Sequence, residues 1–174
     1  MSNDNIEEEE RIANEQYAQA TEIIRGTIRE LPELRERTVS LGRTGTVADA
    51  LNLMVEHRTG AVLIMEDGKL YGLFTERDVI TRIFAQGRAP ADTTITDAMT
   101  LDPECLSYEH EIVFALNKMT VGGFRHVPIL NDDGVPVAVL SMRHLVEHIV
   151  SYYSDEVYNL PPSEDGFTSS REGA

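Results

Sequence analysis

Along the chain, a segment with apolar residues at helical spacing is followed by short continuous apolar runs, and this order occurs twice. In each copy, a segment with apolar residues three and four positions apart predicts an amphipathic helix. Two short apolar runs around an Asp-Gly turn then predict a β-hairpin. A short extended piece precedes each amphipathic helix, and a second helix follows each hairpin. The predicted segments of the two β-α-β-β-α copies are 38–41, 46–57, 61–65, 71–75 and 75–85, then 104–106, 110–121, 126–130, 137–141 and 141–153.

The two copies are related as an internal repeat. Ala50–Met54 reads ALNLM and Ala115–Met119 reads ALNKM, so four of five residues are identical at an offset of 65. Beyond the hairpin turn the offset is 66, and Tyr71–Thr75 corresponds to Val137–Ser141. The extra residue falls inside the second Asp-Gly turn, where a hairpin tolerates an insertion. We therefore predict an α/β (α+β) fold made of two packed copies.

Several segments lie outside the repeats. Residues 5–31 carry a loose helical stripe of apolar residues that ends at Pro32, which predicts an N-terminal helix. Residues 86–92 read as a linker, and 93–99 as a short helix between the copies. The last residues are rich in Pro, Ser and acids, which is typical of disorder. The predicted divisions are an acidic N-terminal helix at 1–34, repeats at 35–92 and 93–158, and a disordered acidic tail at 159–174.

Composition narrows the functions to consider. Hydrophobic residues make up 41% of the 174 residues, enough for a core, while 30 acidic and 15 basic residues give a net charge of -15. A surface this acidic repels phosphate backbones, so we expect no nucleic-acid binding. The single cysteine, Cys105, fits a reducing compartment. The sequence shows no signal peptide and no apolar run of membrane-spanning length, so we expect a cytoplasmic protein without membrane contact.

Two segments carry a resemblance to a known family. Gly72–Val79 reads GLFTERDV and resembles the G-h-h-[TS]-x-x-D-h signature of the CBS domain, in which h is apolar. Phe124–Ile129 reads FRHVPI and is similar to a strand of second CBS repeats. The chain thus resembles, over residues 38–153, a tandem CBS pair (a Bateman module) with pseudo-two-fold packing. The resemblance implies a homodimer that binds adenine nucleotides or related molecules in clefts between the repeats.

Thr75 and Asp78 begin the second helix of the first repeat, and two roles are open to them. A Thr-x-x-Asp pair at a strand-to-helix junction can form a capping box, in which each side chain bonds to the other residue's backbone N–H. Alternatively, Asp78 accepts hydrogen bonds from two ribose hydroxyls, since a carboxylate offers acceptors only. The resemblance favours ligand contact and groups Arg77, which lies between them, with this site.

Small side chains mark a second set of candidates. Gly60 and Ala61 would let the base of a ligand lie against the strand, although tight packing explains them as well. The resemblance further implies that backbone groups of Thr38, Val39 and Leu41 contact the edge of the base.

Arg125 and His126 are the candidates for phosphate binding. Arginine offers a planar fork of donors, and histidine adds a donor that can be switched by protonation. The resemblance places both with the ribose site of the first repeat. The alternatives are a surface ion pair for Arg125 and a histidine bonded to a backbone carbonyl for His126.

The second repeat departs from the family signature. Ser141 keeps the capping position, but His144 stands where the family has an aspartate. An imidazole offers one acceptor at most and cannot hold both ribose hydroxyls. We therefore favour one working nucleotide site, and expect the second to be empty or to prefer an anion. His144 and His148 have a spacing that can bind a metal, but a packed helix surface is the plainer reading, and we predict no metal site.

The candidate site residues and the family resemblance together favour a regulatory, non-catalytic module. It would bind AMP, ADP, ATP or S-adenosylmethionine between its repeats and require no cofactor. No nucleophile-base pair or Gly-rich phosphate loop is evident, so we do not expect an enzyme. A partner protein under its control would be a separate chain. The alternative is a ligand-free dimeric scaffold whose N-terminal helix recruits a partner.

Overall fold

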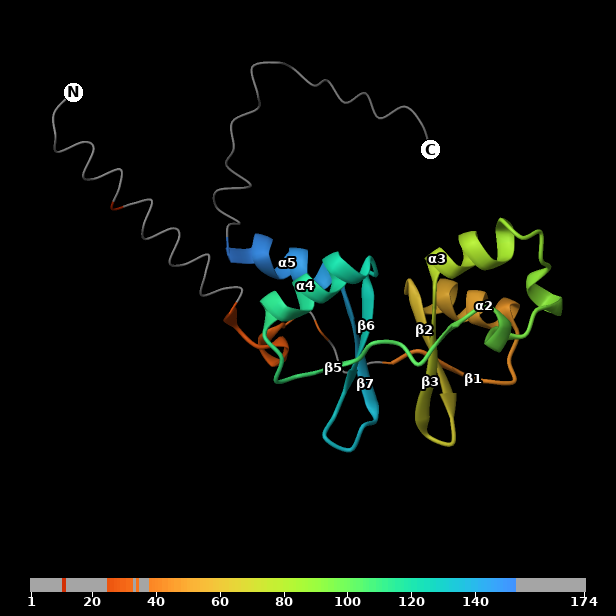
Figure 1. The fold of residues 1–174 in the computed structure, drawn as a ribbon, viewed down its shortest axis with the longest axis horizontal. Helices are drawn as coiled ribbons and strands as arrows, with labels where there is room; N and C mark the ends of the chain where they lie inside the picture. The colour runs from red at the N-terminus through yellow and green to blue at the C-terminus, as the bar shows by residue number, and fades with distance from the viewer. Residues whose placement is uncertain (1–10, 12–24, 33, 35–37, 153–174) are drawn as a thin grey trace, which may run out of the picture.

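The computed structural model describes residues 11, 25–32, 34 and 38–152. The disordered tail predicted at 159–174 lies outside the described residues, as does most of the helix predicted at 5–31. The described residues form two α/β halves that lie side by side (Figure 1). In each half a small sheet faces the other half and the helices lie on the outside.

Each repeat forms its own mixed sheet, and in each the hairpin follows a parallel first strand. The first sheet has the order β1-β2-β3-β4, with strands Ser40–Gly42, Ala61–Glu66, Lys69–Thr75 and Thr100–Leu101. The second has the order β5-β6-β7, with strands Leu106–Ser107, His126–Leu130 and Pro136–Ser141.

The helices also follow the predicted order, which confirms the fold class. The α-helices are α2 (Val47–His57), α3 (Glu76–Asp78), α4 (Ile112–Gly122) and α5 (Met142–Tyr152). The 3-10 turns are η1 (Ile28–Glu30), η3 (Pro90–Asp92) and η4 (Ile95–Asp97), and the π-helix η2 (Val79–Phe84) continues α3. The predicted helix at 75–85 is thus present, but it widens to π geometry directly after Asp78. A π turn is rare in proteins and is common at functional sites.

Local sequence explains the element ends. Thr46 accepts a hydrogen bond from the Asp49 N–H, and the Asp49 carboxylate accepts one from the Thr46 N–H, so a capping box starts α2. Asp67 and Gly68 both have positive φ, at 49° and 78°, as a tight two-residue hairpin turn requires. The register of the first hairpin therefore follows from its turn residues.

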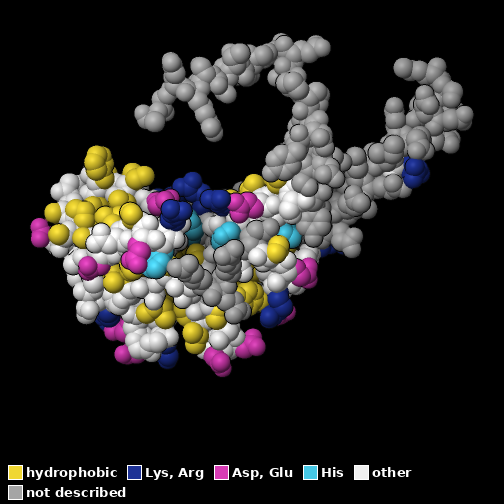
Figure 2. Space-filling view, turned by 180° about the vertical axis from the view of Figure 1, so that it is seen from behind, with side chains coloured by type: hydrophobic (Ala, Val, Ile, Leu, Met, Phe, Trp, Pro, Cys, Tyr) yellow, Lys and Arg dark blue, Asp and Glu magenta, His cyan; other side chains and the backbone are white. Residues whose placement is uncertain are grey.

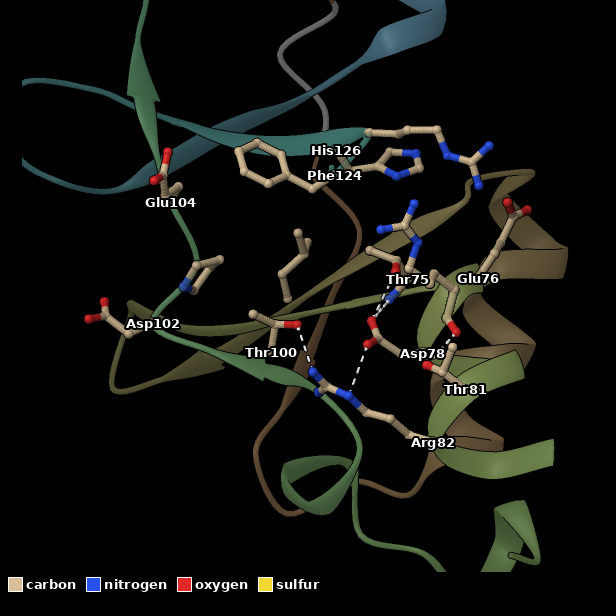
Figure 3. Close-up of a pocket in the computed structure, with 14 residues that line it drawn as sticks. Thr75, Glu76, Asp78, Thr81, Arg82, Thr100, Asp102, Glu104, Phe124 and His126 are labelled. Atoms are coloured by element: carbon tan, nitrogen blue, oxygen red, sulfur yellow. Dashed lines mark hydrogen bonds and ion pairs between the residues drawn. The ribbon is translucent and has the colours of Figure 1, made fainter. Parts of the chain in front are cut away.

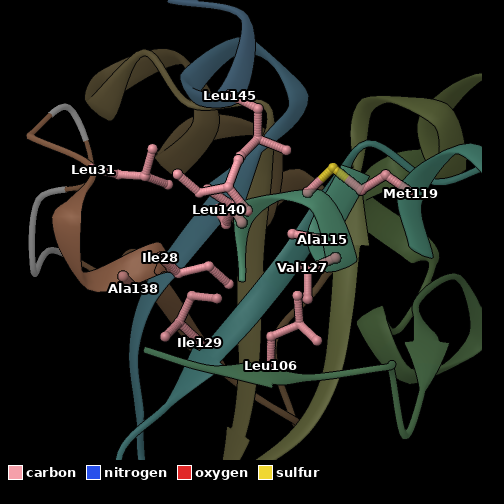
Figure 4. Packing of buried hydrophobic residues seen from close by; sticks show 11 residues of the cluster. Ile28, Leu31, Leu106, Ala115, Met119, Val127, Ile129, Ala138, Leu140 and Leu145 are labelled. Carbon is pink, nitrogen blue, oxygen red and sulfur yellow. The ribbon is translucent and has the colours of Figure 1, made fainter. Parts of the chain in front are cut away.

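The core of each repeat is completed by a turn from near the start of the other repeat. Ile28 in η1 is fully buried in the core of the second repeat, and Ile95 in η4 is fully buried in the core of the first. Matching backbone bonds hold the two turns: Ile28 N–H donates to His110 O, and Ile95 N–H donates to Gly45 O, both at 2.9 Å. Figure 4 shows Ile28 and Leu31 packed among residues of the second repeat.

The chain therefore crosses between the halves more than once. Besides η4, the strand β4 also joins the first sheet, since Gly72 and Leu73 pair with Leu101 and Thr100. A Cβ at Gly72 would lie 2.9 Å from the backbone oxygen of Thr100 and closer still to the Met99 sulfur, so a side chain there would push the crossover away. The boundaries predicted at 35 and 93 remain predictions, and in space each repeat holds residues from beyond its predicted segment.

A third apolar cluster joins the two sheets. Ala61, Leu63 and Leu73 of the first sheet are buried, and Val139 of the second packs against them. This contact fixes the facing arrangement of the sheets and so shapes the clefts on either side of it. Within the described part of the chain, no helix is long and apolar enough to cross a membrane.

Because each turn fills the core of the other repeat, shortening the buried isoleucine of either turn should lower the stability of the protein. Ile28→Ala and Ile95→Ala should each lower the free energy of unfolding by about 2–5 kcal/mol, because each removes fully buried methyl groups. Urea denaturation measures both. Ile80→Ala is the control, since Ile80 is 63% exposed and its loss should change stability by about 0.5 kcal/mol or less. An Ile28→Ala variant that behaves like this control would show that η1 does not complete the core.

Candidate ligand-binding site

A cavity of about 470 Å³, here called the first cavity, lies where β3 and α3 of the first repeat meet the start of β6 (Figure 3). A cavity of this size suits a small-molecule ligand. It brings together Thr75, Arg77 and Asp78 with Arg125 and His126, as the resemblance implied. Its other lining residues are Leu73, Glu76, Thr81, Arg82, Thr100, Asp102, Pro103, Glu104 and Phe124.

Asp78 is nearly enclosed at the base of this cavity, with 8% of its side chain exposed. Its Oδ2 accepts hydrogen bonds from both the backbone N–H and the hydroxyl of Thr75, each at 2.9 Å. Its Oδ1 forms an ion pair with Arg82 Nε at 3.3 Å. The capping role predicted for Asp78 is therefore present, and the carboxylate still faces the cavity. Capping and ligand contact are compatible, because the two oxygens together offer about four acceptor sites and these three contacts leave about one for a ligand hydroxyl.

Arg82 is a functional candidate that sequence reasoning missed. Besides Asp78, its guanidinium donates to the backbone oxygens of Ala98 and Met99 and, at 3.3 Å, to Thr100 Oγ1. It thus ties the helix that carries Asp78 to the crossover segment that forms one wall of the cavity. The i,i+4 spacing from Asp78 was a signal in the sequence, but its contacts to the crossover depend on the fold.

The wall opposite Asp78 comes from the second repeat. Asp102, Pro103 and Glu104 line the first cavity beside Phe124, whose ring offers an apolar surface to a base. Figure 3 shows Glu104 and Phe124 across the cavity from Asp78.

The structure does not bring every predicted residue to these cavities. Thr38, Val39, Leu41 and Ala61 line neither the first cavity nor the second cavity described below. Residue 104 precedes the first strand of its repeat just as Thr38 does, so the expected type of segment is present but comes from the other repeat.

The remaining predicted residues line a wider groove of about 1270 Å³, here called the second cavity. It contains Gly60, Ser141 and His144, and shares Arg125 and His126 with the first cavity. Its other lining residues are Pro32, Met54, Val55, Arg58, Thr59, Glu76, Val139, Met142, Arg143, Val146 and Glu147. Figure 2 shows basic and histidine side chains gathered across the middle of one face of the molecule.

His144 takes over the capping role of the missing aspartate. Its Nδ1 accepts a hydrogen bond from the Ser141 N–H at 3.2 Å, and the His144 N–H donates to Ser141 Oγ at 3.3 Å. Since Nδ1 is an acceptor here, the neutral ring carries its proton on Nε2. The second cavity therefore has a histidine donor where the first has a carboxylate acceptor.

His126 lies between the two cavities, and charged groups of both repeats affect its pKa. Burial lowers the pKa of His126 below its usual value of 6.5, and Arg125 and His144 lower the pKa further. Glu76 acts in the opposite direction. His126 is therefore mainly neutral at pH 7, and a bound anion would raise its pKa.

Two further features concern metals and thiols. Among the described residues, no group of three or more His, Cys, Asp and Glu side chains is arranged to hold a metal ion. The Cys105 thiol donates to Pro103 O, and burial raises its pKa, with a smaller contribution from Asp102. A raised pKa leaves little of the reactive thiolate at neutral pH.

The sequence matches the CBS domain twice, over residues 28–85 and 90–151, and the chain belongs to the CBS domain family. The CBS domain-containing protein CBSCBSPB5 of Arabidopsis thaliana is 33% identical over 121 residues, covering 70% of this chain and 22% of that protein. The chain thus spans about a fifth of the length of that relative. The resemblance that the two sequence motifs carried is confirmed.

Solved structures agree on the fold. A CBS domain protein from Pyrobaculum aerophilum complexed with AMP is 23% identical, has a TM-score of 0.61, and aligns over 72% of this chain and 98% of its own. A CBS domain pair in complex with 5′-methylthioadenosine and S-adenosyl-L-methionine is 18% identical, with a TM-score of 0.63, over 70% and 97% of the two chains. At these identities the likeness shows the fold of a CBS pair.

The lowered pKa of His126 predicts a pH effect on stability. The unfolded chain takes up a proton at this residue near pH 6.5, before the folded chain does, so the free energy of unfolding should fall as pH decreases below 6.5. His126→Gln should show a smaller fall between pH 7 and pH 5, measured by urea denaturation. NMR titration of the His126 ring is the direct check, and a midpoint above 6.5 in the ligand-free protein would contradict the assignment.

Proposed function

We propose that the protein is a regulatory module that binds an adenine nucleotide or a related adenosyl ligand in the first cavity. The observation that carries this proposal is the meeting of Asp78 and Thr75 of one repeat with Arg125 and His126 of the other in one cavity. A carboxylate that can accept from ribose hydroxyls thus lies in the same space as cations that can receive phosphate.

The cavity also offers a place for a base. Phe124, Leu73 and Pro103 present apolar surface, and an aromatic ring stacks well on a purine. The two solved CBS proteins named above were crystallised with AMP and with adenosyl compounds, which supports the same ligand class for this chain.

Regulation is the role that follows from such a site. A ligand in the first cavity would touch both repeats and the crossover wall that Arg82 holds, so binding would favour one arrangement of the repeats. A homodimer acting on a separate protein chain is the form of control we propose. A cytoplasmic location and a non-catalytic role belong to the same proposal.

The ribose role of Asp78 predicts the effect of a single isosteric change. Asp78→Asn should weaken AMP binding by about tenfold or more, because it removes a charged acceptor while asparagine can still cap the helix. Calorimetric titration with AMP, ADP, ATP and S-adenosylmethionine measures this. Asp97→Asn is the control, since Asp97 pairs with Arg88 and lines neither cavity. Equal affinities for wild type and Asp78→Asn would exclude the assigned site.

The ligand-free scaffold is the second candidate, and the replacement of the family aspartate by His144 favours it. Thermal unfolding separates the two. A binder must gain stability from its ligand by mass action, so a saturating adenosyl ligand should raise the melting temperature. A melting temperature unchanged by all four ligands would support the scaffold instead.

A further inference from the structure

The first and second cavities adjoin at a neck, and the neck is formed by residues of both repeats. Glu76, Arg125 and His126 line both cavities. Gly60 lies at the same place: a Cβ there would come within 3.2 Å of both Glu76 Cδ and His126 Cε1. A side chain at residue 60 would press on both groups, so glycine here lets Glu76 and His126 lie where the two cavities adjoin.

Positive charge is distributed unevenly across the neck. Of the residues that line the first cavity alone, two are arginines (Arg77 and Arg82) and three are acids (Asp78, Asp102 and Glu104). Both arginines are committed to protein acceptors: Arg82 as described above, and Arg77 to the backbone oxygen of Gly123.

The second cavity has the opposite balance. The residues that line it alone include two arginines, Arg58 and Arg143, and one acid, Glu147, which pairs with Nε of Arg143 at 2.6 Å and leaves the two terminal nitrogens of that guanidinium to face a ligand. His144 adds an imidazole beside them, with its neutral-state proton on Nε2. At the neck, the Arg125 guanidinium makes no hydrogen bond or ion pair with any residue of the described part. An anion that starts in the first cavity would therefore find its cationic partners at the neck and beyond it.

We propose that the preferred ligand is a nucleoside di- or triphosphate that spans both cavities. Its adenosine lies in the first cavity against Asp78, and its phosphate chain passes Arg125 and His126 into the second cavity toward Arg143 and Arg58. The proposal rests on the proposed function and extends it by assigning the length of the phosphate chain. It also gives the replacement at His144 a purpose, because a phosphate needs a donor there and a ribose needs an acceptor.

The test is calorimetric titration of the full chain with AMP, ADP and ATP in magnesium-free buffer. Affinity should rise in that order, with one ATP bound per chain. Arg143→Gln and Arg58→Asn should each weaken ATP binding by about tenfold and change AMP binding by less than about twofold. Both variants should fold, since the Arg143 side chain is 82% exposed and asparagine tolerates the positive φ of Arg58.

One substitution should act in the opposite direction. The Glu76 carboxylate lies at the neck and repels a passing phosphate, so Glu76→Gln should strengthen ATP binding more than AMP binding. Arg29→Gln is the charge-matched control for the two arginine variants, since Arg29 pairs with Glu109 and lines neither cavity.

The outcomes separate the two levels of the proposal. If AMP and ATP bind equally, if two ATP bind per chain, or if Arg143→Gln leaves ATP affinity unchanged, the spanning ligand is wrong while the adenosyl site stands. If no nucleotide binds, the proposed function itself is wrong.

Discussion

The exchange of two buried isoleucines between the repeats is the contact on which the rest of the structure depends. Neither repeat closes its own core: Ile28, at the start of the first matched CBS repeat, fills the second, and Ile95, near the start of the second, fills the first. Burial of an isoleucine is worth about 1.5–3 kcal/mol, so each half gains stability from a turn that belongs to the other. The stabilities of the two halves are therefore coupled, and their facing sheets enclose clefts that neither would have alone.

The crossover that brings Ile95 into the first repeat also forms the site. After η4 the chain adds β4 to the first sheet, passes Gly72 at close range, and continues as Asp102, Pro103 and Glu104 along the wall of the first cavity. Arg82 bonds to this crossover and to Asp78. A residue that stabilises the fold thus also orients the carboxylate proposed to bind ribose.

The pseudo-symmetry of the fold makes the differences between the repeats informative. Thr75 and Asp78 of one repeat correspond to Ser141 and His144 of the other, and in both pairs the N–H of the first residue donates to the side chain of the second. The shared geometry shows that capping alone accepts either side chain. The side chain at this position can therefore differ according to what each cavity binds. The carboxylate lies in the cavity where acids outnumber arginines, and the imidazole lies in the cavity where arginines outnumber acids.

The sequence by itself determined the order of elements, the two hairpins and the position of Asp78 at a helix start, because periodicity, Asp-Gly turns and capping motifs act over a few neighbouring residues. The family motif in the sequence also put forward Arg125 and His126 as candidates, and their binding role stays a prediction. Only the tertiary structure decided that Asp102–Glu104, rather than Thr38–Leu41, lies across from Asp78, and that Arg82 contacts the crossover. Those contacts join residues of different repeats, and the packing of one half on the other, which no local pattern encodes, sets which segments meet.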